Sequence, residues 1–400
     1  MRRAVAASPM SRRCRGMAMA GSLGLVAVLA ASCSSGGGSG GSGGSDAASG
    51  VSASQAASVK APVLDSLTGS QKTQIAELIV KARTEKSFSW IDSVVASPTA
   101  SAMWSAFEKE YGLSGIKLSY QRLTSGELST QVEQQVQSGK VTTDFFGTAS
   151  PALFSELKQS NALDHYVSPE SSAYSYASKY VAEDPGYYIA PDAYAFGIIV
   201  NPKLYSTALT SWKDLSVAAL KGKWDAPDVA ANEGSLLWYY GLSKKLPKSV
   251  FQGWAANDPK TSSGSSAQEA QKVAEGQVDA VVTSGFRASQ TVAQTGVPLK
   301  VYYPKEGNVL DGQTYGIMAS SPDTAVAELF DDFLLSKTGQ QIYVDKEGIA
   351  SFYPGVKAPA KDLAYQPSIS DMSIIPLNTS KVSSSDLTDA RNEWRSLFSK

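Results

Sequence analysis

The sequence predicts an α/β protein made of two lobes, each a mostly parallel sheet with helices on both faces. Three observations predict this class. Strand-like and helical segments alternate along the chain from about residue 70. A probable strand over residues 193–202 is followed by a second alternating set. The ordered part, from about residue 60 onward, is long enough for two domains of ordinary size. Two α/β lobes joined by crossing strands are the simplest assembly of these segments.

The first alternating set begins with a helix over residues 70–86. Its apolar side chains recur at i, i+3, i+4 and i+7 from Ile75 to Ala82, the spacing of one helical face. The next helix opens at Ser97-Pro98, which is a typical helix start. The other segments of this set are strands expected over 88–91, 116–123 and 142–147, and helices expected over 97–112, 125–139 and 150–163.

The second set follows the long strand expected over residues 193–202. Its strands are expected over 278–284, 299–304 and 313–320, and its helices over 236–245, 249–257, 266–277, 286–296, 321–335 and 339–348. A last helix is expected over 383–398, where apolar side chains recur at helical spacing from Leu387 to Leu397.

The N-terminus has the order of a secretory signal peptide. Arginines are frequent in its first fifteen residues, and an apolar stretch too short to span a bilayer follows over 17–31. The run LAASC, which ends at Cys33, resembles the bacterial lipobox, with its leucine one position earlier than usual. This resemblance implies removal of residues 1–32 and attachment of a lipid to Cys33. A plain signal peptide followed by an incidental cysteine is the alternative.

A flexible tether is expected after the lipidated cysteine. Residues 34–58 are mostly Gly, Ser and Ala, a composition that behaves as a flexible coil. We therefore assign 1–32 to the signal peptide and 33–60 to the lipidated cysteine and tether. The only other cysteine, Cys14, lies in the removed segment, so the mature chain has no internal disulfide. The protein is expected on the outer face of the bacterial cytoplasmic membrane, as a monomer.

The charge and composition of the chain limit the partners that it can have. Without residues 1–32 the chain keeps 31 Lys and Arg against 37 Asp and Glu, a formal net charge of −6. No basic stripe is visible, which argues against nucleic acid as a partner. The sequence shows no second membrane segment and no internal repeat. A soluble globular domain behind the anchor is the consequence.

Several phrases of the sequence resemble extracellular solute-binding proteins of bacterial ABC importers. The resemblance is to the branch that includes ferric-ion, phosphonate, thiamine and polyamine binders, and it covers nearly everything from Gln74 to Lys400. It rests on the order and spacing of these stretches: AELIVKARTEKSFSWIDS, TSGEL, DFFGTASPALFSELKQSNALDHY, TSWKDL, LKGKWDAPD and AELFDDFLLSKTGQQIYVDKEGIASFYPGVK.

The resemblance implies a type II periplasmic-binding-protein fold, with a ligand cleft between the lobes. We expect residues 61–195 and 300–400 to form the first lobe and 196–299 the second. The family's members close on a small-molecule solute by a hinge motion and deliver it to a membrane permease and its ATPase. The protein is accordingly expected to bind without catalysis, cofactor or metal.

The residues expected to hold a ligand lie at strand-to-helix junctions. In open α/β sheets ligands bind beyond the carboxyl ends of strands, where helix N-termini present N–H groups, although Ser, Thr and Asn at such places also cap helices. The set adds Arg287 as an anion partner and two tyrosines beside the crossing strands, for which core packing is the alternative. The predicted ligand-binding residues are Asp92, Ser93, Ser125, Gly126, Gly147, Thr148, Ser150, Tyr194, Asn232, Gly234, Ser235, Thr283, Ser284, Arg287 and Tyr315.

The chemistry of the expected ligand follows from one departure from the family pattern. Ferric binders of this family carry adjacent tyrosines just after the strand that corresponds to 278–284, whereas this chain has Ser284-Gly285-Phe286-Arg287 there. Phe286 offers no ligand atom, and Arg287 repels a metal cation. An organic solute with an anionic or mixed-charge head, such as a phosphonate, is therefore favoured, and ferric iron is the alternative.

Two other classes of protein are alternatives for this sequence, a serine hydrolase and a non-catalytic surface lipoprotein. The stretches SELK, from Ser155, and KTG, from Lys337, match motifs of penicillin-binding proteins and β-lactamases, but the intervening S-D-N element is missing. His165 is the only histidine, and it has no nucleophile signal beside it. A non-catalytic surface or structural lipoprotein is the second reading, and the absence of repeats counts against it.

Overall fold

The computed structural model describes residues 50–181, 183–262 and 264–398. Residues 49–400 form one compact unit, and the description below concerns that unit. The predicted signal peptide, Cys33 and most of the predicted tether lie outside the described residues. Within the described part, no helix combines the length and the apolar character that a membrane crossing requires.

The described unit contains one sheet of ten strands. The path through it is β2-β1-β3-β9-β4-β7-β5-β6, and both β8 and β10 also pair with β4. β1, β2 and β3 run parallel, as do β5, β6 and β7, whereas β4 and β9 are antiparallel to their neighbours. The strands are β1 Ser87–Asp92, β2 Lys117–Arg122, β3 Phe145–Thr148, β4 Ile189–Val200, β5 Trp224–Pro227, β6 Lys260–Ser262, β7 Ala280–Ser284, β8 Lys300–Tyr302, β9 Leu310–Ile317 and β10 Ala350–Ser351.

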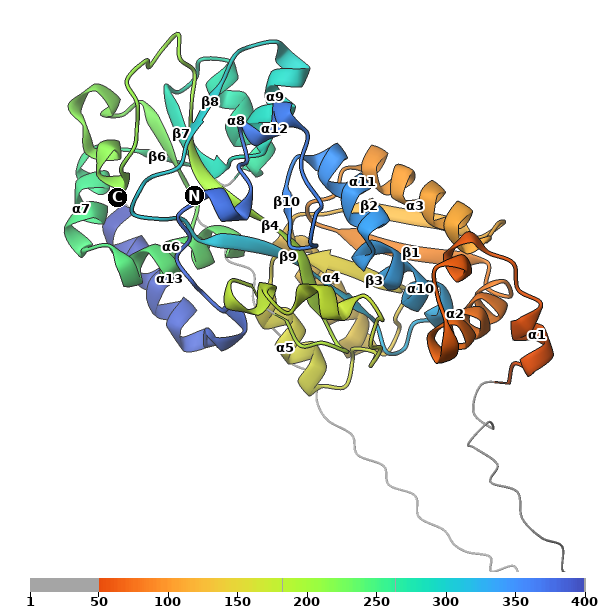
Figure 1. Ribbon diagram of the computed structural model, residues 1–400. Helices are drawn as coiled ribbons and strands as arrows, with labels where there is room; N and C mark the ends of the chain where they lie inside the picture. Colours follow the sequence, from red (N-terminus) through yellow and green to blue (C-terminus); the bar gives the residue numbers. More distant parts are fainter. Residues whose placement is uncertain (1–49, 182, 263, 399–400) are drawn as a thin grey trace, which may run out of the picture. The chain divides into compact units, whose positions relative to one another are not determined.

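β4 and β9 connect two groups of strands (Figure 1). The first half of β4, from Ile189 to Ala195, pairs with β9, which also pairs with β3. Its second half, from Phe196 to Val200, pairs with β7 and β8. All twelve residues of β4 are buried. We call the part around β1–β3 the first lobe and the part around β5–β7 the second lobe, with β4 and β9 as the crossing strands.

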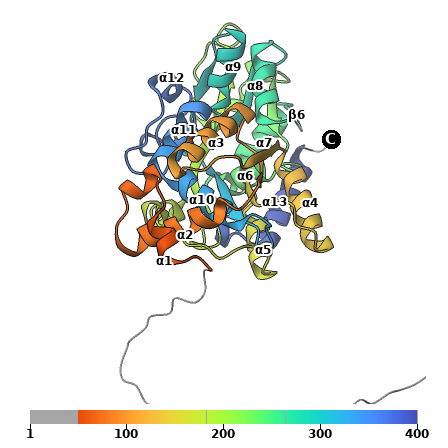
Figure 2. The ribbon, with the colours of Figure 1, turned by 90° about the vertical axis from the view of Figure 1, so that its right-hand side faces the viewer.

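Helices cover the sheet in both lobes. Those of the first lobe follow strands in the order expected from periodicity, and α3, α10 and α11 contact one another on one face (Figure 2). The helices are α1 Ala53–Ala57, α2 Gly69–Ala82, α3 Ser97–Tyr111, α4 Ser125–Ser138, α5 Pro151–Gln159, α6 Glu233–Lys245, α7 Lys248–Ala256, α8 Ser266–Ala274, α9 Arg287–Thr295, α10 Thr324–Leu335, α11 Lys337–Glu347, α12 Ala360–Leu363 and α13 Ser384–Phe398. Short 3₁₀ helices occupy Pro62–Asp65, Ser171–Tyr174, Ala177–Lys179, Trp212–Ser216, Ala218–Leu220, Ile369–Asp371 and Thr379–Lys381.

Aromatic clusters fill the core of each lobe. In the first lobe Phe330 of α10 lies 5.0 Å from both Phe88 and Trp90, measured between ring centroids. In the second lobe Trp238 and Trp254 stack with centroids 6.0 Å apart, and the indole of Trp254 donates to the carbonyl of Trp212. Because these rings are buried and come from different elements, they fix helices against the strands that carry the functional loops.

The structure moves two segments from the expected first lobe to the second. β8 pairs with the second half of β4, and α13 packs against α6 and α7, so both belong with the second lobe although they lie within 300–400. The ring of Trp394 meets that of Tyr239 with centroids 5.1 Å apart, and Lys248 forms an ion pair with Glu393 at 3.0 Å. The expected division into lobes at residues 195 and 300 stays a prediction, and these two contacts favour placing both segments with the second lobe.

The fold also begins earlier than expected. The predicted tether runs to residue 60, yet α1 is helical over Ala53–Ala57 and packs against α2. Ser52 starts this helix with a capping box, and Ala56 is buried. Periodicity did not predict α1, β5, β6 or β10, because each spans at most five residues and shows too few repeats.

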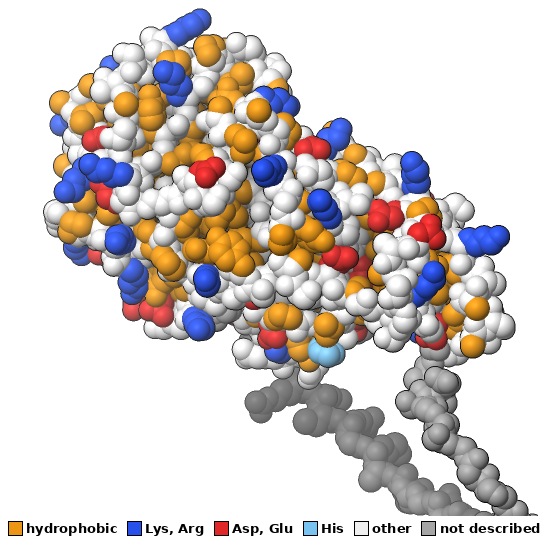
Figure 3. Space-filling model, in the orientation of Figure 1, with side chains coloured by type: hydrophobic (Ala, Val, Ile, Leu, Met, Phe, Trp, Pro, Cys, Tyr) orange, Lys and Arg blue, Asp and Glu red, His pale blue; other side chains and the backbone are white. Residues whose placement is uncertain are grey.

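Lysine and arginine side chains are scattered over the face shown in Figure 3. They alternate there with acidic side chains and apolar patches and form no stripe. On this face the scattered charges agree with the sequence, in which no basic stripe is visible.

Candidate ligand-binding site

A cavity lies where the two lobes meet the crossing strands. Its volume is about 1050 Å³, part of it open to solvent. Loops from the first lobe, loops from the second lobe and side chains of β4 and β9 all contribute to the wall. We call this the cleft cavity. Of the predicted ligand-binding residues, it is lined by Ser93, Ser125, Gly126, Tyr194, Asn232, Gly234, Ser235, Thr283, Ser284 and Arg287.

A tight turn after β1 forms one part of the first-lobe wall. Asp92 is fully buried at the end of β1, and its Oδ1 accepts the backbone N–H groups of Val94 (2.7 Å) and Val95 (2.8 Å). Gln313 of β9 donates to the same oxygen at 3.0 Å. Asp92 therefore holds the turn that presents Ser93 and Val94 to the cavity, without lining the cavity itself.

The N-terminus of α4 forms the other part of this wall. Thr124 caps the helix through a capping box with Glu127, so the first turn is fixed. Ser125 and Gly126 are the first two helical residues and line the cavity, where their N–H groups have no partner within the helix. Arg122, at the end of β2, also lines the cavity; its side chain is exposed and makes no hydrogen bond or ion pair within the described residues.

Two helix starts supply much of the second-lobe wall. Asn232 caps α6 by accepting the backbone N–H of Ser235 at 2.9 Å. Gly234 has to be glycine, because a Cβ there would lie 2.2 Å from Oδ2 of Asp311. Ser265 caps α8 in the same way as Thr124 caps α4, and it lines the cavity next to Ser266.

The end of β7 adds two hydroxyl groups. Thr283 and Ser284 are 2 % and 3 % exposed, and both line the cavity. Neither hydroxyl has a hydrogen-bond partner within the described part of the chain. Because both residues line the cavity and their hydroxyls have no partner there, these two groups are available to a ligand that fills the cavity.

Arg287 closes the second-lobe wall at the start of α9. It is 3 % exposed, and its guanidinium lies 3.8 Å from Oε2 of Glu347 and donates to Oε1 of Gln290 at 2.7 Å. A longer bond of 3.4 Å joins it to the carbonyl of Val94 in the first lobe. Burial, and next the charge of Arg122, lower its pKa to about 10, so it remains a cation at neutral pH.

Aromatic side chains form the floor of the cavity. Tyr194 and Phe196 project from β4, and the ring of Phe286 lies 5.2 Å from that of Tyr194. The hydroxyl of Tyr194 donates to Oδ2 of Asp311 at 2.8 Å. The two residues lie directly opposite each other on the crossing strands β4 and β9. An apolar floor below polar walls is typical of sites for small organic molecules.

Buried acids near the floor make the fold sensitive to pH. Burial raises the pKa of both Asp92 and Asp311 from 3.8 to about 7. The folded protein therefore keeps protons that the unfolded chain has lost, and its stability falls as the pH rises from about 4 to about 7.

This dependence on pH predicts a change in melting temperature. We expect the Tm to be at least about 5 °C higher at pH 5 than at pH 7.5, measured by calorimetry. The variant Asp311→Asn should reduce this dependence; an equal Tm at the two pH values would contradict it.

The remaining predicted residues do not line the cleft cavity. Besides Asp92, they are Gly147, Thr148, Ser150 and Tyr315. A Cβ on Gly147 would lie 2.4 Å from the ring of Tyr315, so glycine is needed there for packing. Thr148 is fully buried at the end of β3, opposite Thr314 of β9.

Ser150 and Tyr315 make contacts with other parts of the protein. Ser150 donates to the carboxylate of Glu233 across the lobes. The Tyr315 ring stacks on Phe145, and its hydroxyl lies 3.2 Å from that of Tyr343. At these positions the structure shows core packing or a contact between lobes, and their expected ligand contact stays a prediction.

Several lining residues were not predicted from the sequence. The signal for Arg122 was available, because it ends a strand parallel to β1 and so lies at the same sheet edge as Ser93. Asp311 gave no local signal, since its partner Tyr194 is 117 residues away in the chain. The other unpredicted lining residues are Val94, Pro227, Asp228, Ala231, Gly264, Ser265, Ser266, Glu269 and Phe286.

The serine-hydrolase motifs do not assemble into a site. Ser155 lies in the middle of α5, and Lys158, one turn later, is paired with Asp184. The K-T-G residues begin α11, which is capped by Ser336, whereas the hydrolase motif requires a strand. The ring of His165 packs against Tyr187, with centroids 4.8 Å apart. Among the described residues these groups occupy separate places.

The fold is shared with solved structures of periplasmic binding proteins. Solved structures with this fold include the periplasmic binding protein AfuA of Actinobacillus pleuropneumoniae with exogenous fructose-6-phosphate bound, which is 20% identical with a TM-score of 0.66 over 79% of this chain and 99% of that chain. Iron-bound HitA of Pseudomonas aeruginosa is 18% identical with a TM-score of 0.59 over 78% and 99%. The spermidine/putrescine ABC transporter substrate-binding protein PotD of Streptococcus pneumoniae is 17% identical with a TM-score of 0.57 over the same shares. The chain thus has the two-lobed fold of periplasmic binding proteins, as the sequence predicts.

The family follows from the sequence match. Residues 102–368 match the profile of the bacterial extracellular solute-binding proteins. Because this match spans more than half of the chain, the protein belongs to that family, and the predicted family is confirmed. Among curated protein sequences, no significant match was found.

Proposed function

We propose that this protein is the substrate-binding lipoprotein of an ABC importer, which captures an anionic or mixed-charge organic solute in the cleft cavity. It delivers the solute to a membrane permease and its ATPase and performs no catalysis. The observation that carries this proposal is the joint lining of one cavity by Arg122, Arg287 and the starts of α4, α6, α8 and α9. Lipid attachment at Cys33, on the outer face of the membrane, is part of the proposal and rests on the LAASC run.

The charges of the cavity favour an anionic head group. Arg122 is exposed and unpaired, so its guanidinium can bind a carboxylate or phosphate in a bidentate manner without losing another partner. Helix N-termini place partial positive charge on the same anion. Asp228 and Glu269 also line the cavity, on the second-lobe wall, and they can accept donors from the far end of a mixed-charge solute.

The lining does not favour ferric iron. Tyr194 is the only tyrosine among the described residues that line the cavity, and its hydroxyl already donates to Asp311. Two arginines at the same cavity repel a metal cation, and the acids of its lining, Asp228, Glu269 and Asp311, are not grouped as metal ligands among the described residues. Iron remains the alternative against which the proposal is tested.

Solute capture is proposed to shift the lobes toward a closed state that the permease recognises. Contacts that span the lobes already exist: Ser150 bonds Glu233, and Arg287 reaches Val94. A solute that touches both walls stabilises these contacts, and the shift is limited by the difference in its affinity for the two states.

Arg122→Gln tests the anionic character of the site. Binding of inorganic phosphate and of methylphosphonate should be measured by titration calorimetry on the protein in detergent. We expect the variant to bind at least about 10-fold more weakly, because one charge-assisted contact is lost. Lys117→Gln, at the exposed far end of the same strand, is the matched control and should bind like the wild type. Equal binding by both variants, or binding of ferric citrate alone, would contradict the proposal.

A further inference from the structure

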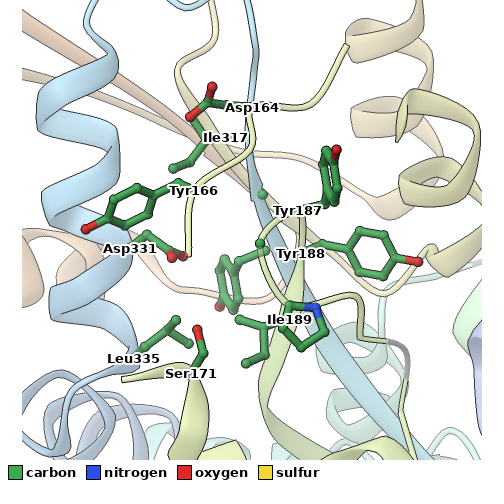
Figure 4. A pocket seen from close by; sticks show the side chains of 13 residues that line it. Asp164, Tyr166, Ser171, Tyr187, Tyr188, Ile189, Ile317, Asp331 and Leu335 are labelled. Carbon is green, nitrogen blue, oxygen red and sulfur yellow. The ribbon is translucent and has the colours of Figure 1, made fainter. Parts of the chain in front are cut away.

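A second, smaller cavity lies within the first lobe (Figure 4). It is enclosed by the loops around Tyr166 and Tyr187, by the end of β9 and by α10, and its volume is about 330 Å³, part of it open to solvent. No residue of the second lobe lines it. It is thus separate from the cleft cavity, although Tyr315 of β9 is in its wall.

The polar groups of this cavity are all oxygen atoms. They come from Asp164, Asp331, Ser171 and the tyrosines, and no lysine, arginine or histidine lines the cavity. Lys158, which lies beside the lining residue Tyr187, already has other partners. Lys158 is paired with Asp184 and lies over the ring of Tyr187, 4.4 Å from its centroid.

Asp331 is the unusual member of this wall. It is 9 % exposed, and it makes no hydrogen bond or ion pair within the described residues. Figure 4 shows its carboxylate directed into the cavity, with the hydroxyl of Ser171 directed toward the same space. A buried carboxylate without a partner is unfavourable, so a cation bound in the cavity would supply what the protein does not.

The surroundings of Asp331 disfavour a negative charge on it, and a bound cation would offset them. Asp332, next in the chain, accepts from the hydroxyl of Tyr166 at 2.7 Å, and Glu328 lies one turn earlier on α10. Both acids repel a charge on Asp331, and burial together with these neighbours raises its pKa well above the ordinary value. Oδ2 of Asp164, on the opposite wall, is also buried without a partner.

We propose that the first-lobe cavity binds a small primary ammonium compound, with Asp331 as its counter-ion. The carboxylates of Asp331 and Asp164 and the hydroxyl of Ser171 can accept hydrogen bonds from an ammonium group. A metal ion fits less well, because the described residues contain no group of three His, Cys, Asp or Glu placed to hold one. The enclosed part of the cavity is small, so only the smallest ammonium compounds are expected to place their head group in it.

Thermal unfolding with methylammonium chloride tests the proposal. At equal ionic strength, methylammonium should raise the Tm of the wild type by about 2 °C or more relative to sodium chloride. Asp331→Asn, which keeps the shape of the side chain, should abolish this rise. Asp345→Asn removes an exposed carboxylate from the neighbouring α11 and should retain the rise. If Asp331→Asn does not fold, Asp164→Asn on the opposite wall replaces it in the test. This variant should weaken the rise.

Further arms separate the alternatives. Gly126→Trp, in the cleft cavity, should retain the methylammonium effect, which makes this proposal independent of the proposed transport function. Tetramethylammonium, which is bulkier and has no N–H donor, should give no rise. An equal rise in wild type and Asp331→Asn, or an equal effect of tetramethylammonium, would overturn the proposal. A larger rise with calcium that Asp331→Asn abolishes would overturn it in favour of a metal site.

Discussion

Replacing Gly126 by tryptophan is expected to abolish solute binding while the fold is kept. Gly126 lines the cleft cavity near the start of α4, and a Cβ built there has no atom within 4 Å. The larger side chain therefore meets open space in the empty protein and occupies the space of the solute. We expect the affinity for inorganic phosphate or a phosphonate to fall at least about 100-fold, and the Tm without ligand to change by about 1 °C at most.

Gln134→Trp is the matched control for this change. It places the same side chain on an exposed position of α4 that does not line the cavity. Calorimetric titration of the two variants separates occlusion of the cavity from a general effect of tryptophan on the helix. Undiminished binding by Gly126→Trp would remove the cleft cavity as the solute site.

Replacing Arg287 by methionine is expected to destabilise the protein by about 3 kcal/mol or more. The change keeps the apolar stem but removes the guanidinium that faces Glu347, a carboxylate that is 1 % exposed. Glu347 then keeps only neutral partners, the N–H of Ala96 and the amide of Gln290. An uncompensated buried charge costs this much when its partner is removed. Denaturant unfolding measures the loss.

A second substitution shows whether the charge of Glu347 is the cause. Glu347→Gln in the Arg287→Met background removes the unpaired charge and should restore a large part of the stability, so the two changes should be strongly non-additive. The double variant should still bind solute poorly, because the cavity has lost a cation. Additive losses of stability would show that the two side chains do not act as a pair.

Local patterns predicted most of the elements that build the site. The periodicity from Ile75 to Ala82 and the alternation of later segments placed the main helices and strands close to their observed bounds. The helix start at Ser125 was predicted, whereas α6 begins at Glu233, three residues before the predicted start at residue 236. Thr124 and Asn232 cap these two helices and line the cleft cavity, because a helix start and a strand end meet at the same sheet edge.

Local sequence patterns do not predict which elements far apart in the chain pack together. Nothing near Trp394 shows that its helix packs on α6 of the second lobe, since helical spacing gives a buried face but not its partner. Asp92 is polar at a junction, as a ligand residue would be, yet its Oδ1 accepts the N–H groups of the turn and its side chain does not line the cleft cavity. Tyr315 was expected beside a ligand, but its ring is required between Phe145 and Gly147.

A thermal-shift panel on the wild type and Gly126→Trp tests the central claim most directly. The panel holds phosphonates, phosphate esters, thiamine, polyamines, neutral sugars and ferric citrate. The account predicts that at least one anionic or mixed-charge organic compound raises the Tm of the wild type, since ligand at about 100 times its Kd adds about 2.7 kcal/mol, and that it leaves the variant unchanged. A rise with ferric citrate alone, or an equal rise in both proteins, would contradict the account.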